Sequence, residues 1–227
     1  MRAIVAIGGG NLASGETRAI DEAIVSLTDK LTPRVLFLPT ASHDHPGYIQ
    51  EVQKAYTALG CTVEALCLWN SPPDPSSIRD ALLNADIVYV GGGNTLSMLN
   101  LWHTLHVDDV LREAWARGVV LSGLSAGALC WFAHGVTDQV GHGTDSLAWM
   151  NGLGLIPYTL CPHYDEPFWA AFDCMAQQAP TPAIALENGS ALMVLDGRMT
   201  VLHAQENASA WLFRPGQPRQ RYEGGFL

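Results

Sequence analysis

The stretch VVLSGLSAGALCWF at residues 119–132 carries the most information about the fold. Four residues of strand character lead into Gly-Leu-Ser-Ala-Gly, and a helix-like run follows at once. Small residues at such a junction have two uses. They let a helix lie close to a sheet, with the serine as its cap, or they lift Ser125 clear of the backbone as a nucleophile on a tight turn. The rest of the chain must distinguish the two.

Outward from this stretch, short apolar runs alternate with longer amphipathic ones. The apolar runs of strand length lie at residues 2–7, 34–38, 62–68, 86–90 and 119–122. Helical spacing of apolar residues occupies residues 17–27, 46–59, 76–84, 95–102 and 107–116, and a further helix follows Ser125. Strands that alternate with helices predict an α/β fold with a mostly parallel sheet and helices on both faces. The sequence shows no internal repeat.

The last third of the chain has a different pattern. Short strand-like runs at 182–186, 191–195 and 199–203 are separated by Asn188-Gly189 and Asp196-Gly197. Both dipeptides favour the positive φ of tight hairpin turns, so we predict antiparallel strands near the C-terminus. No long linker interrupts the pattern, and we therefore expect a single domain over residues 1–227.

Composition narrows the class of protein. The 227 residues are 48% hydrophobic and 15% charged, with a formal net charge of −10. The scattered basic residues argue against a nucleic-acid or anionic-membrane partner. Five cysteines with no CxxC pair predict free, buried thiols rather than disulfides or a zinc site. The N-terminal apolar run is too short for a signal peptide, so we expect a cytoplasmic protein without metal or cofactor.

Two strand-to-helix turns form the candidate site, because ligands bind beyond the carboxyl ends of parallel strands. They are VGGGNT at 90–95 and GLSAG at 123–127. In the second, Ser125 would be a nucleophile and the N–H of Ala126 an oxyanion donor, with another donor from the first. Each motif has a simpler explanation, since a glycine triplet at a helix N-terminus also binds phosphate. The GGGN at 8–11 is interpreted as a turn.

A serine nucleophile needs a base, and His163 is the best placed of eight histidines. It lies in LCPHYD at 160–165, after an apolar run that ends in proline, and so at the same edge of the sheet. The alternative role for His163 is a loop residue that makes one backbone hydrogen bond. The thiol of Cys130 lies more than a helical turn from the elbow, which argues against a cysteine nucleophile.

The motifs GGGNT (91–95), GLSAGA (123–128) and CPHYD (161–165), in this order and spacing, resemble the peptidase E family of serine peptidases, which includes alpha-aspartyl dipeptidases and relatives of cyanophycinase. The resemblance extends to ALENGSALMV at 185–194. It implies an α/β fold related to class I glutamine amidotransferases and no cofactor. It also implies a nucleophile, a base and an oxyanion or substrate site at Ser125, His163, Gly92, Gly93, Asn94 and Ala126.

The third catalytic residue is where this sequence departs from the family. The family usually carries an acid directly before Gly-Ser or Gly-Thr, a place that Asn188 occupies here, and Glu187 stands one residue earlier. Neighbouring residues of a strand face opposite sides. We select Glu187 as the acid, with Asp138 and Asp165 as alternatives.

The resemblance implies short peptides with an N-terminal aspartate as substrates. Arg18, Arg34 and Arg198 are candidate partners for its carboxylate, and none is favoured. Aromatic residues near the motifs suggest an apolar pocket: Trp131, Tyr164, Phe168 and Trp169. We therefore expect a serine-type peptidase acting through a Ser-His-acid site and an acyl-enzyme, as a monomer or homodimer. The alternatives are a family member with another N-terminal specificity and a non-catalytic module that binds phosphate or a small molecule.

Overall fold

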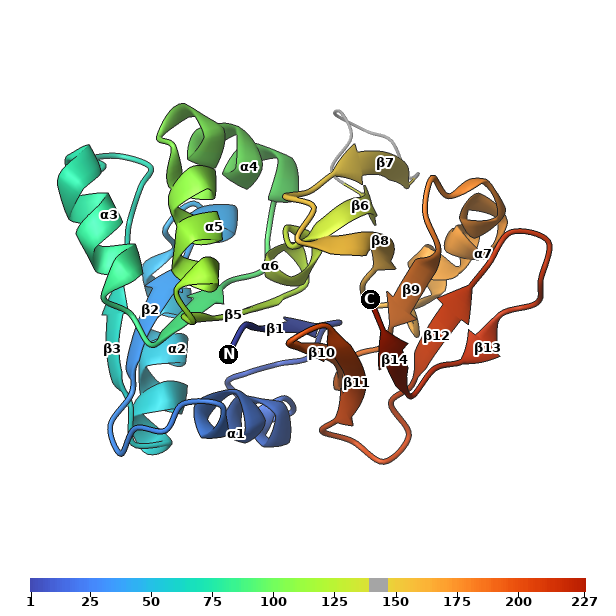
Figure 1. The fold of residues 1–227 in the computed structure, drawn as a ribbon, viewed down its shortest axis with the longest axis horizontal. Coiled ribbons are helices and arrows are strands. Elements are labelled where there is room, and N and C mark those ends of the chain that lie inside the picture. The colour runs from blue at the N-terminus through green and yellow to red at the C-terminus, as the bar shows by residue number, and fades with distance from the viewer. Residues whose placement is uncertain (139–146) are drawn as a thin grey trace.

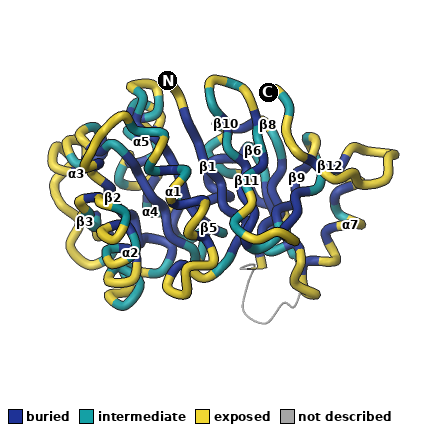
Figure 2. The backbone as a smooth tube through the Cα atoms, turned by 90° about the horizontal axis from the view of Figure 1, so that it is seen from below, coloured by how far each residue is buried: buried dark blue, intermediate teal, exposed yellow. Residues whose placement is uncertain are grey.

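The computed structural model describes residues 1–138 and 147–227, and two β-sheets dominate this part of the chain (Figure 1). The larger sheet has eight strands in the order β14-β11-β10-β1-β5-β4-β2-β3. The smaller has six, in the order β13-β12-β9-β8-β6-β7. Buried residues form the strands at the centre of the molecule, and exposed ones lie at its periphery (Figure 2).

Five neighbouring strands of the larger sheet are parallel. They are β1 (Ala3–Ile7), β5 (Val120–Leu124), β4 (Ile87–Val90), β2 (Arg34–Leu38) and β3 (Thr62–Ala65). Three antiparallel strands extend the sheet beyond β1: β10 (Ser190–Leu195), β11 (Arg198–His203) and β14 (Gly224–Phe226). The predicted α/β class, with a parallel core and antiparallel C-terminal strands, is confirmed.

Helices cover both faces of the larger sheet (Figure 1). One face carries α1 (Arg18–Ser26) and α2 (Pro46–Ala58). The other carries α3 (Pro75–Leu83), α4 (Thr95–Thr104) and α5 (Val107–Ala116). Because side chains alternate along a strand, β1 serves both cores: Ala3, Val5 and Ile7 pack in the core with α1 and α2, whereas Ile4 and Ala6 pack in the core with α3, α4 and α5.

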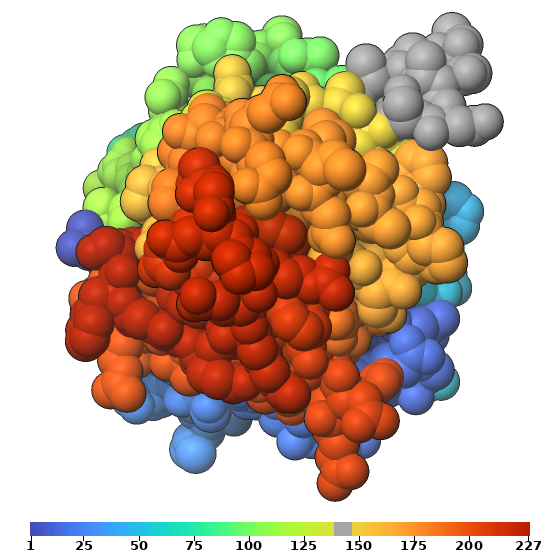
Figure 3. All heavy atoms as spheres, turned by 90° about the vertical axis from the view of Figure 1, so that its right-hand side faces the viewer, coloured from blue at the N-terminus to red at the C-terminus, as the bar shows by residue number. Residues whose placement is uncertain are grey.

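The smaller sheet lies beside the larger one. Its strands are β6 (Phe132–Thr137), β7 (Ala148–Asn151), β8 (Ile156–Cys161), β9 (Ala183–Leu186), β12 (Ala210–Phe213) and β13 (Gln220–Arg221). Only the neighbouring pairs β6–β8 and β8–β9 are parallel among these strands. Between β8 and β9 lie the 3₁₀ turn Pro167–Ala171, helix α7 (Phe172–Met175) and the turn Ala176–Gln178. The last third of the chain covers this side of the molecule (Figure 3).

The two predicted hairpin turns have different outcomes. Asp196 and Gly197 both have positive φ, and Leu195 pairs with Arg198, so this turn joins β10 to β11 as predicted. The hairpin at Asn188-Gly189 is wrong, because β9 and β10 belong to different sheets. The chain crosses here between the sheets, and the Gly189 N–H donates to Gly9 O at 3.0 Å. This crossing carries Asn188 into the candidate site.

The third predicted strand also ends early. It was expected to reach residue 68, but β3 stops at Ala65. The N–H groups of Leu68 and Trp69 both donate to the Asp44 carboxylate at 2.8 Å, so they do not take part in the hydrogen bonds of the sheet.

All five cysteines are free, although Cys67 and Cys174 are exposed rather than buried.

Candidate active site

Ser125 lies at the sharp turn between β5 and α6 (Ala126–Leu129), with φ 57° and ψ −110°. Few non-glycine residues adopt this backbone, which is typical of a nucleophile elbow. Gly123 and Gly127 are required on steric grounds, because a Cβ at Gly123 would overlap Gly127 O and one at Gly127 would overlap Val90 O. The helix after the serine has only four residues.

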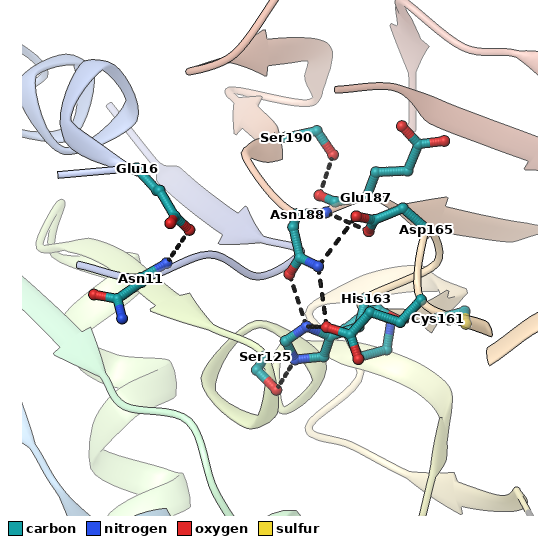
Figure 4. A network of polar contacts seen from close by, with 11 residues as sticks. Asn11, Glu16, Ser125, Cys161, His163, Asp165, Glu187, Asn188 and Ser190 are labelled. Carbon is teal, nitrogen blue, oxygen red and sulfur yellow. Dashed lines mark hydrogen bonds and ion pairs between the residues drawn. The ribbon is translucent and has the colours of Figure 1, made fainter. Parts of the chain in front are cut away.

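His163 follows β8 and faces this serine (Figure 4). Its Nε2 lies 2.8 Å from Ser125 Oγ. The backbone of His163 has φ 52°, and its N–H donates to Gly8 O at 3.2 Å, which anchors the turn to the end of β1. Ser125 follows a strand of the larger sheet and His163 follows a strand of the smaller one. The fold thus brings a hydroxyl and an imidazole that are distant in sequence into hydrogen-bond contact.

Asn188 and Glu166 face the other nitrogen of the imidazole. Nδ1 of His163 lies 2.9 Å from Asn188 Oδ1 and 3.2 Å from Glu166 Oε1. The Asn188 amide is oriented because its Nδ2 donates to Glu166 Oε1 at 3.0 Å and to Asp165 Oδ2 at 3.2 Å. Two acceptors therefore face Nδ1, which places the ring proton there and leaves the Nε2 lone pair to accept the Ser125 hydroxyl.

The structure corrects the expectation for Glu187. Its carboxylate accepts the Ser209 N–H at 2.7 Å and the Trp211 Nε1–H at 2.8 Å, and it points away from His163 (Figure 4). Glu187 and Asn188 both follow the end of β9 at Leu186, where the chain turns toward β10, and their side chains leave this turn in different directions. Of the alternative acids, Asp165 contacts the Asn188 amide and its backbone N–H, and Asp138 lines the nearby cavity.

Glu166 was not a candidate in the sequence. It lies three residues after His163, and its N–H donates to His163 O at 2.9 Å, which closes a turn that returns its carboxylate to the imidazole. The spacing alone was available as a signal, since i,i+3 residues meet across such a turn.

The predicted oxyanion donors divide into two groups. Ala126 is the first residue of α6, so its N–H has no acceptor within the helix, and Gly93 lines the same cavity as Ser125 and Ala126. By contrast, the Gly92 N–H donates to Tyr48 Oη at 3.2 Å. The Asn94 N–H donates to Ala41 O at 2.8 Å.

The Asn94 side chain also has a structural role. Its Oδ1 accepts the Ser97 N–H at 2.9 Å and caps α4. The N–H groups of Gly92 and Asn94 and the Asn94 Oδ1 thus have partners within the protein, whereas Gly93 and Ala126 border the cavity beside Ser125.

The first glycine triplet is part of the site, which the sequence did not indicate. A Cβ at Gly9 would overlap Asn188 Oδ1 and His163 Nδ1. Glycine lets the strand end pass directly beneath the pair that orients the imidazole. The interpretation of residues 8–11 as a turn alone was too narrow.

A cavity of about 260 Å³ opens beside Ser125. It is lined by Gly93, Thr95, Ser125, Ala126, Leu129, Val136, Thr137, Asp138, Pro162, His163, Glu166 and Trp169. Trp169 is the one predicted aromatic residue in this lining.

The other three predicted aromatic residues lie elsewhere. Trp131 is fully buried in the core. Tyr164 contacts Asp173 and Arg219, and Phe168 is exposed.

Within residues 1–138 and 147–227, no group of three or more His, Cys, Asp or Glu side chains is arranged to hold a metal ion. In the same part of the chain, no helix has the length and apolar character needed to cross a membrane.

A serine on a strained strand-to-helix turn, in contact with an imidazole and next to the N-terminal N–H of a helix, is the geometry of a hydrolase nucleophile and its base. Comparison with known proteins agrees with this class. The chain belongs to peptidase family S51, whose model matches residues 4–202.

Individual relatives carry peptidase names. The chain is 41% identical over 166 residues to "Uncharacterized peptidase YgaJ" of Bacillus subtilis, which covers 73% of this chain and 70% of that one. It is 32% identical over 139 residues to "Probable alpha-aspartyl dipeptidase" of Drosophila melanogaster, covering 59% and 53%. The fold is similar to the crystal structure of a peptidase from an acI-B1 Actinobacterium, with a TM-score of 0.71 and 20% identity over 100% and 97% of the chains.

Proposed function

We propose that this chain is a serine-type peptidase that cleaves short peptides through an acyl-enzyme. The observation that carries the proposal is the 2.8 Å contact between Ser125 Oγ and His163 Nε2 at a strained elbow. Membership of a peptidase family indicates that the bond cleaved is a peptide bond, and the cavity beside Ser125 provides room for a small substrate.

In the proposed reaction, Ser125 Oγ attacks the peptide carbonyl carbon while its proton passes to His163 Nε2. The oxyanion accepts hydrogen bonds from the N–H groups of Ala126 and Gly93. The C–N bond then breaks, and His163 returns the proton to the leaving amine. Water, deprotonated by His163, attacks the ester carbon and releases the second product and the serine.

Asn188, rather than Glu187, orients the imidazole. Its Oδ1 accepts the Nδ1–H of His163 and holds the tautomer that makes Nε2 a base. An amide stabilises an imidazolium less well than a carboxylate does. Glu166, 3.2 Å from Nδ1, supplies the negative charge that the amide lacks.

The test is a comparison of the native protein with Ser125→Ala, measuring hydrolysis of a dipeptide panel and covalent labelling by a fluorophosphonate. We expect the native protein to be labelled at Ser125 and to hydrolyse dipeptides, and the variant to do neither while its thermal unfolding midpoint is unchanged. Undiminished hydrolysis by a pure Ser125→Ala preparation would refute the proposal. Absence of labelling together with absence of hydrolysis in the native protein would favour the binding-module alternative.

An N-terminal aspartate as the preferred substrate residue rests on the family resemblance and on the name of the Drosophila relative. The described lining of the cavity contains no lysine or arginine that could pair with the aspartate carboxylate. Cytoplasmic location and a monomeric or homodimeric state remain predictions from the sequence.

A further inference from the structure

The chain from His163 to Trp169 folds into two successive turns of three residues. The Glu166 N–H donates to His163 O at 2.9 Å, and the Trp169 N–H donates to Glu166 O at 3.0 Å. Turns closed at this spacing bend the chain back on itself, and the side chains of all three residues line the cavity beside Ser125. His163 therefore has two neighbours from its own segment, a carboxylate and an indole.

The indole of Trp169 lies against the imidazole of His163. The two ring centroids are 5.8 Å apart and the ring planes are inclined by 34°, which is nearer to a stacked than to an edge-on arrangement. Trp169 is only 7% exposed and packs in the core of the smaller sheet with Phe172 and Phe213, so its ring is held in place. The imidazole is thus within the distance at which an aromatic face attracts a cation, about 6 Å from the ring centroid.

The charge of His163 changes during the proposed reaction. The imidazole is neutral before it takes the Ser125 proton, and it is an imidazolium until it gives that proton to the leaving amine. Indole is the aromatic side chain whose face attracts a cation most strongly, and a neutral imidazole lacks this attraction. An interaction that forms only as the charge forms lowers the barrier to reaction instead of tightening the binding of substrate.

The polar contacts of His163 leave a use for such a group. Its Nδ1 faces the Asn188 amide, which stabilises an imidazolium less well than a carboxylate does. Glu166 lies 3.2 Å from Nδ1, but its carboxylate also accepts the Asn188 amide and its side chain is exposed, so water weakens its attraction to the ring. The buried indole of Trp169 is not screened in this way.

We propose that Trp169 is a positioning residue of this site, which stabilises the imidazolium form of His163 through the face of its indole. Trp169 acts through His163 and needs no contact with the substrate. This inference rests on the proposed function, since it adds a residue to the same catalytic machinery.

The first experiment compares Trp169→Leu, which removes the aromatic face, with Trp169→Phe, which keeps a weaker one. For the best dipeptide substrate, we expect kcat to fall at least fivefold in Trp169→Leu and about twofold in Trp169→Phe, with KM within about twofold of wild type in both. Folding is checked by circular dichroism and thermal unfolding.

The pH profile separates the proposed role from simple packing. The acid limb of kcat/KM reports protonation of the free base. Because the imidazolium loses a stabilising contact, this limb should move to lower pH by about half a unit in Trp169→Leu. A purely structural role would lower the midpoint of thermal unfolding and leave the acid limb in place. An unmoved acid limb in folded Trp169→Leu would overturn the proposal.

The other ionisable groups around His163 are the same in every variant. They are Glu166 on its own segment, Asp165, which accepts the Asn188 amide, and Asp138, which lines the cavity after β6. A shift of the acid limb can therefore be assigned to the indole.

Phe168→Leu is the matched control. Phe168 is an exposed aromatic residue of the same 3₁₀ turn and packs edge-on against Trp169. It should leave both kcat and the acid limb unchanged. Equal changes in Phe168→Leu and Trp169→Leu would show a general disturbance of the turn and would refute a specific role of the indole.

A second measurement keeps Trp169 in place, so it does not depend on how the Trp169 variants fold. An imidazolium in contact with an indole quenches its fluorescence more strongly than a neutral imidazole does. We expect the tryptophan emission of Ser125→Ala to fall as the pH is lowered from about 8 to about 5, and to fall less when His163→Gln is added. Both proteins also carry His43→Gln, because His43 stacks on Trp69 with centroids 4.3 Å apart and would add quenching of its own.

An identical pH response with and without His163 would overturn the proposal, since the indole would then not sense the charge of the imidazole.

Failure of this inference is distinguishable from failure of the proposed function. If no peptide is hydrolysed and Ser125 is not labelled in the native protein, the proposed function fails, whatever the fluorescence shows. If hydrolysis depends on Ser125 while the acid limb is unmoved in folded Trp169→Leu, only the role of Trp169 is refuted.

Discussion

Glu187 and Asn188 are adjacent in the chain and face opposite sides of it. The Glu187 carboxylate accepts hydrogen bonds from Ser209 and Trp211 and stabilises the contact between β9 and β12, whereas Asn188 Oδ1 contacts His163. The side chain closest to His163 Nδ1 is thus a neutral amide, and the carboxylates of Asp165 and Glu166 lie around it. Its surroundings give a reason for the amide, because a carboxylate at position 188 would lie against Asp165 and Glu166.

Replacing Asn188 by aspartate should therefore lower activity, although it would restore an acid at the family's usual position. Three carboxylates would crowd the site, and the two hydrogen bonds that Asn188 Nδ2 donates would be lost. We expect kcat/KM for the best dipeptide to fall at least tenfold in Asn188→Asp. It should return to within about threefold of wild type in Asn188→Asp with Glu166→Gln.

The control for this pair is Glu187→Gln, which keeps the side-chain shape and should leave kcat/KM within about twofold of wild type. The explanation would be contradicted if Asn188→Asp were more active than wild type, or if Glu187→Gln were inactive while folded.

Gly9 makes a second prediction, since a methyl group there would overlap both Asn188 Oδ1 and His163 Nδ1. We expect Gly9→Ala to lower kcat at least a hundredfold through displacement of the imidazole, with the fold retained by circular dichroism. In the double variant with Asn188→Ala, the two losses should be strongly non-additive, because both act on one contact.

Gly47→Ala is the matched control. It places the same methyl group in the first turn of α2, where the nearest contact is the exposed ring of His45, the N-cap residue of that helix. Full activity in Gly9→Ala would show that the first glycine triplet is only a turn.

Local signals in the sequence were enough to predict the parallel core and the convergence of Ser125 and His163. Ser125 and His163 each follow a strand whose carboxyl end is recognisable from its apolar run and the turn residues after it. The orientation of the imidazole could not be predicted in the same way. It depends on the crossing at Asn188-Gly189, and a turn dipeptide does not reveal whether the strands that it joins share a sheet.

The remaining differences have a similar origin. Gly9 contacts His163 only because β1 lies between β5 and β10 in the sheet, and strand order is a property of the whole chain. The hydrogen bond of the Gly92 N–H could not be predicted, because its acceptor, Tyr48, lies on α2, 44 residues away in the sequence. Hydrogen-bond partners at such separations carry no local pattern.

Tyr48 supports a third prediction, about the loop that carries Gly93. Its hydroxyl accepts the Gly92 N–H, and its ring packs edge-on against the Phe37 ring with the two centroids 5.2 Å apart. Tyr48 therefore holds the loop beside the proposed oxyanion site in place. Burial raises the pKa of Tyr48, which keeps the phenol neutral. In Tyr48→Phe the part-buried Gly92 N–H loses its hydrogen-bond partner, which costs at most about 1–3 kcal/mol in free energy of unfolding.

We expect Tyr48→Phe to lower kcat about tenfold with KM changed less than twofold, since the loop would be displaced relative to the transition state rather than the bound substrate. Affinity for a peptide boronic acid, which mimics the tetrahedral state, should fall by the same factor as kcat. Tyr222→Phe is the control, because its hydroxyl contacts Met199 in the C-terminal strands. Equal changes in kcat for both variants would indicate a general loss of packing instead.

Asp21 gives a prediction about stability rather than catalysis. It is a buried residue of α1 whose carboxylate accepts hydrogen bonds from Thr17 and Tyr56, and burial raises its pKa from 3.8 to about 6. The folded state therefore holds this proton more tightly than the unfolded state does, and unfolding releases it between pH 4 and 6. The free energy of unfolding must then fall as pH rises through this window and level off above it.

The size of the effect is at most about 3 kcal/mol, since each unit of pKa difference corresponds to about 1.4 kcal/mol. Other carboxylates titrate in the same range, so the quantity to measure is the difference in free energy of unfolding between wild type and Asp21→Asn, by urea denaturation from pH 4 to 8. Asp21→Asn should gain stability relative to wild type as pH rises from 4 to about 6.5, and the difference should then stay constant. With Asp29→Asn, an exposed carboxylate, the corresponding difference should be flat, and a flat profile for Asp21→Asn as well would mean that Asp21 titrates normally in the folded protein.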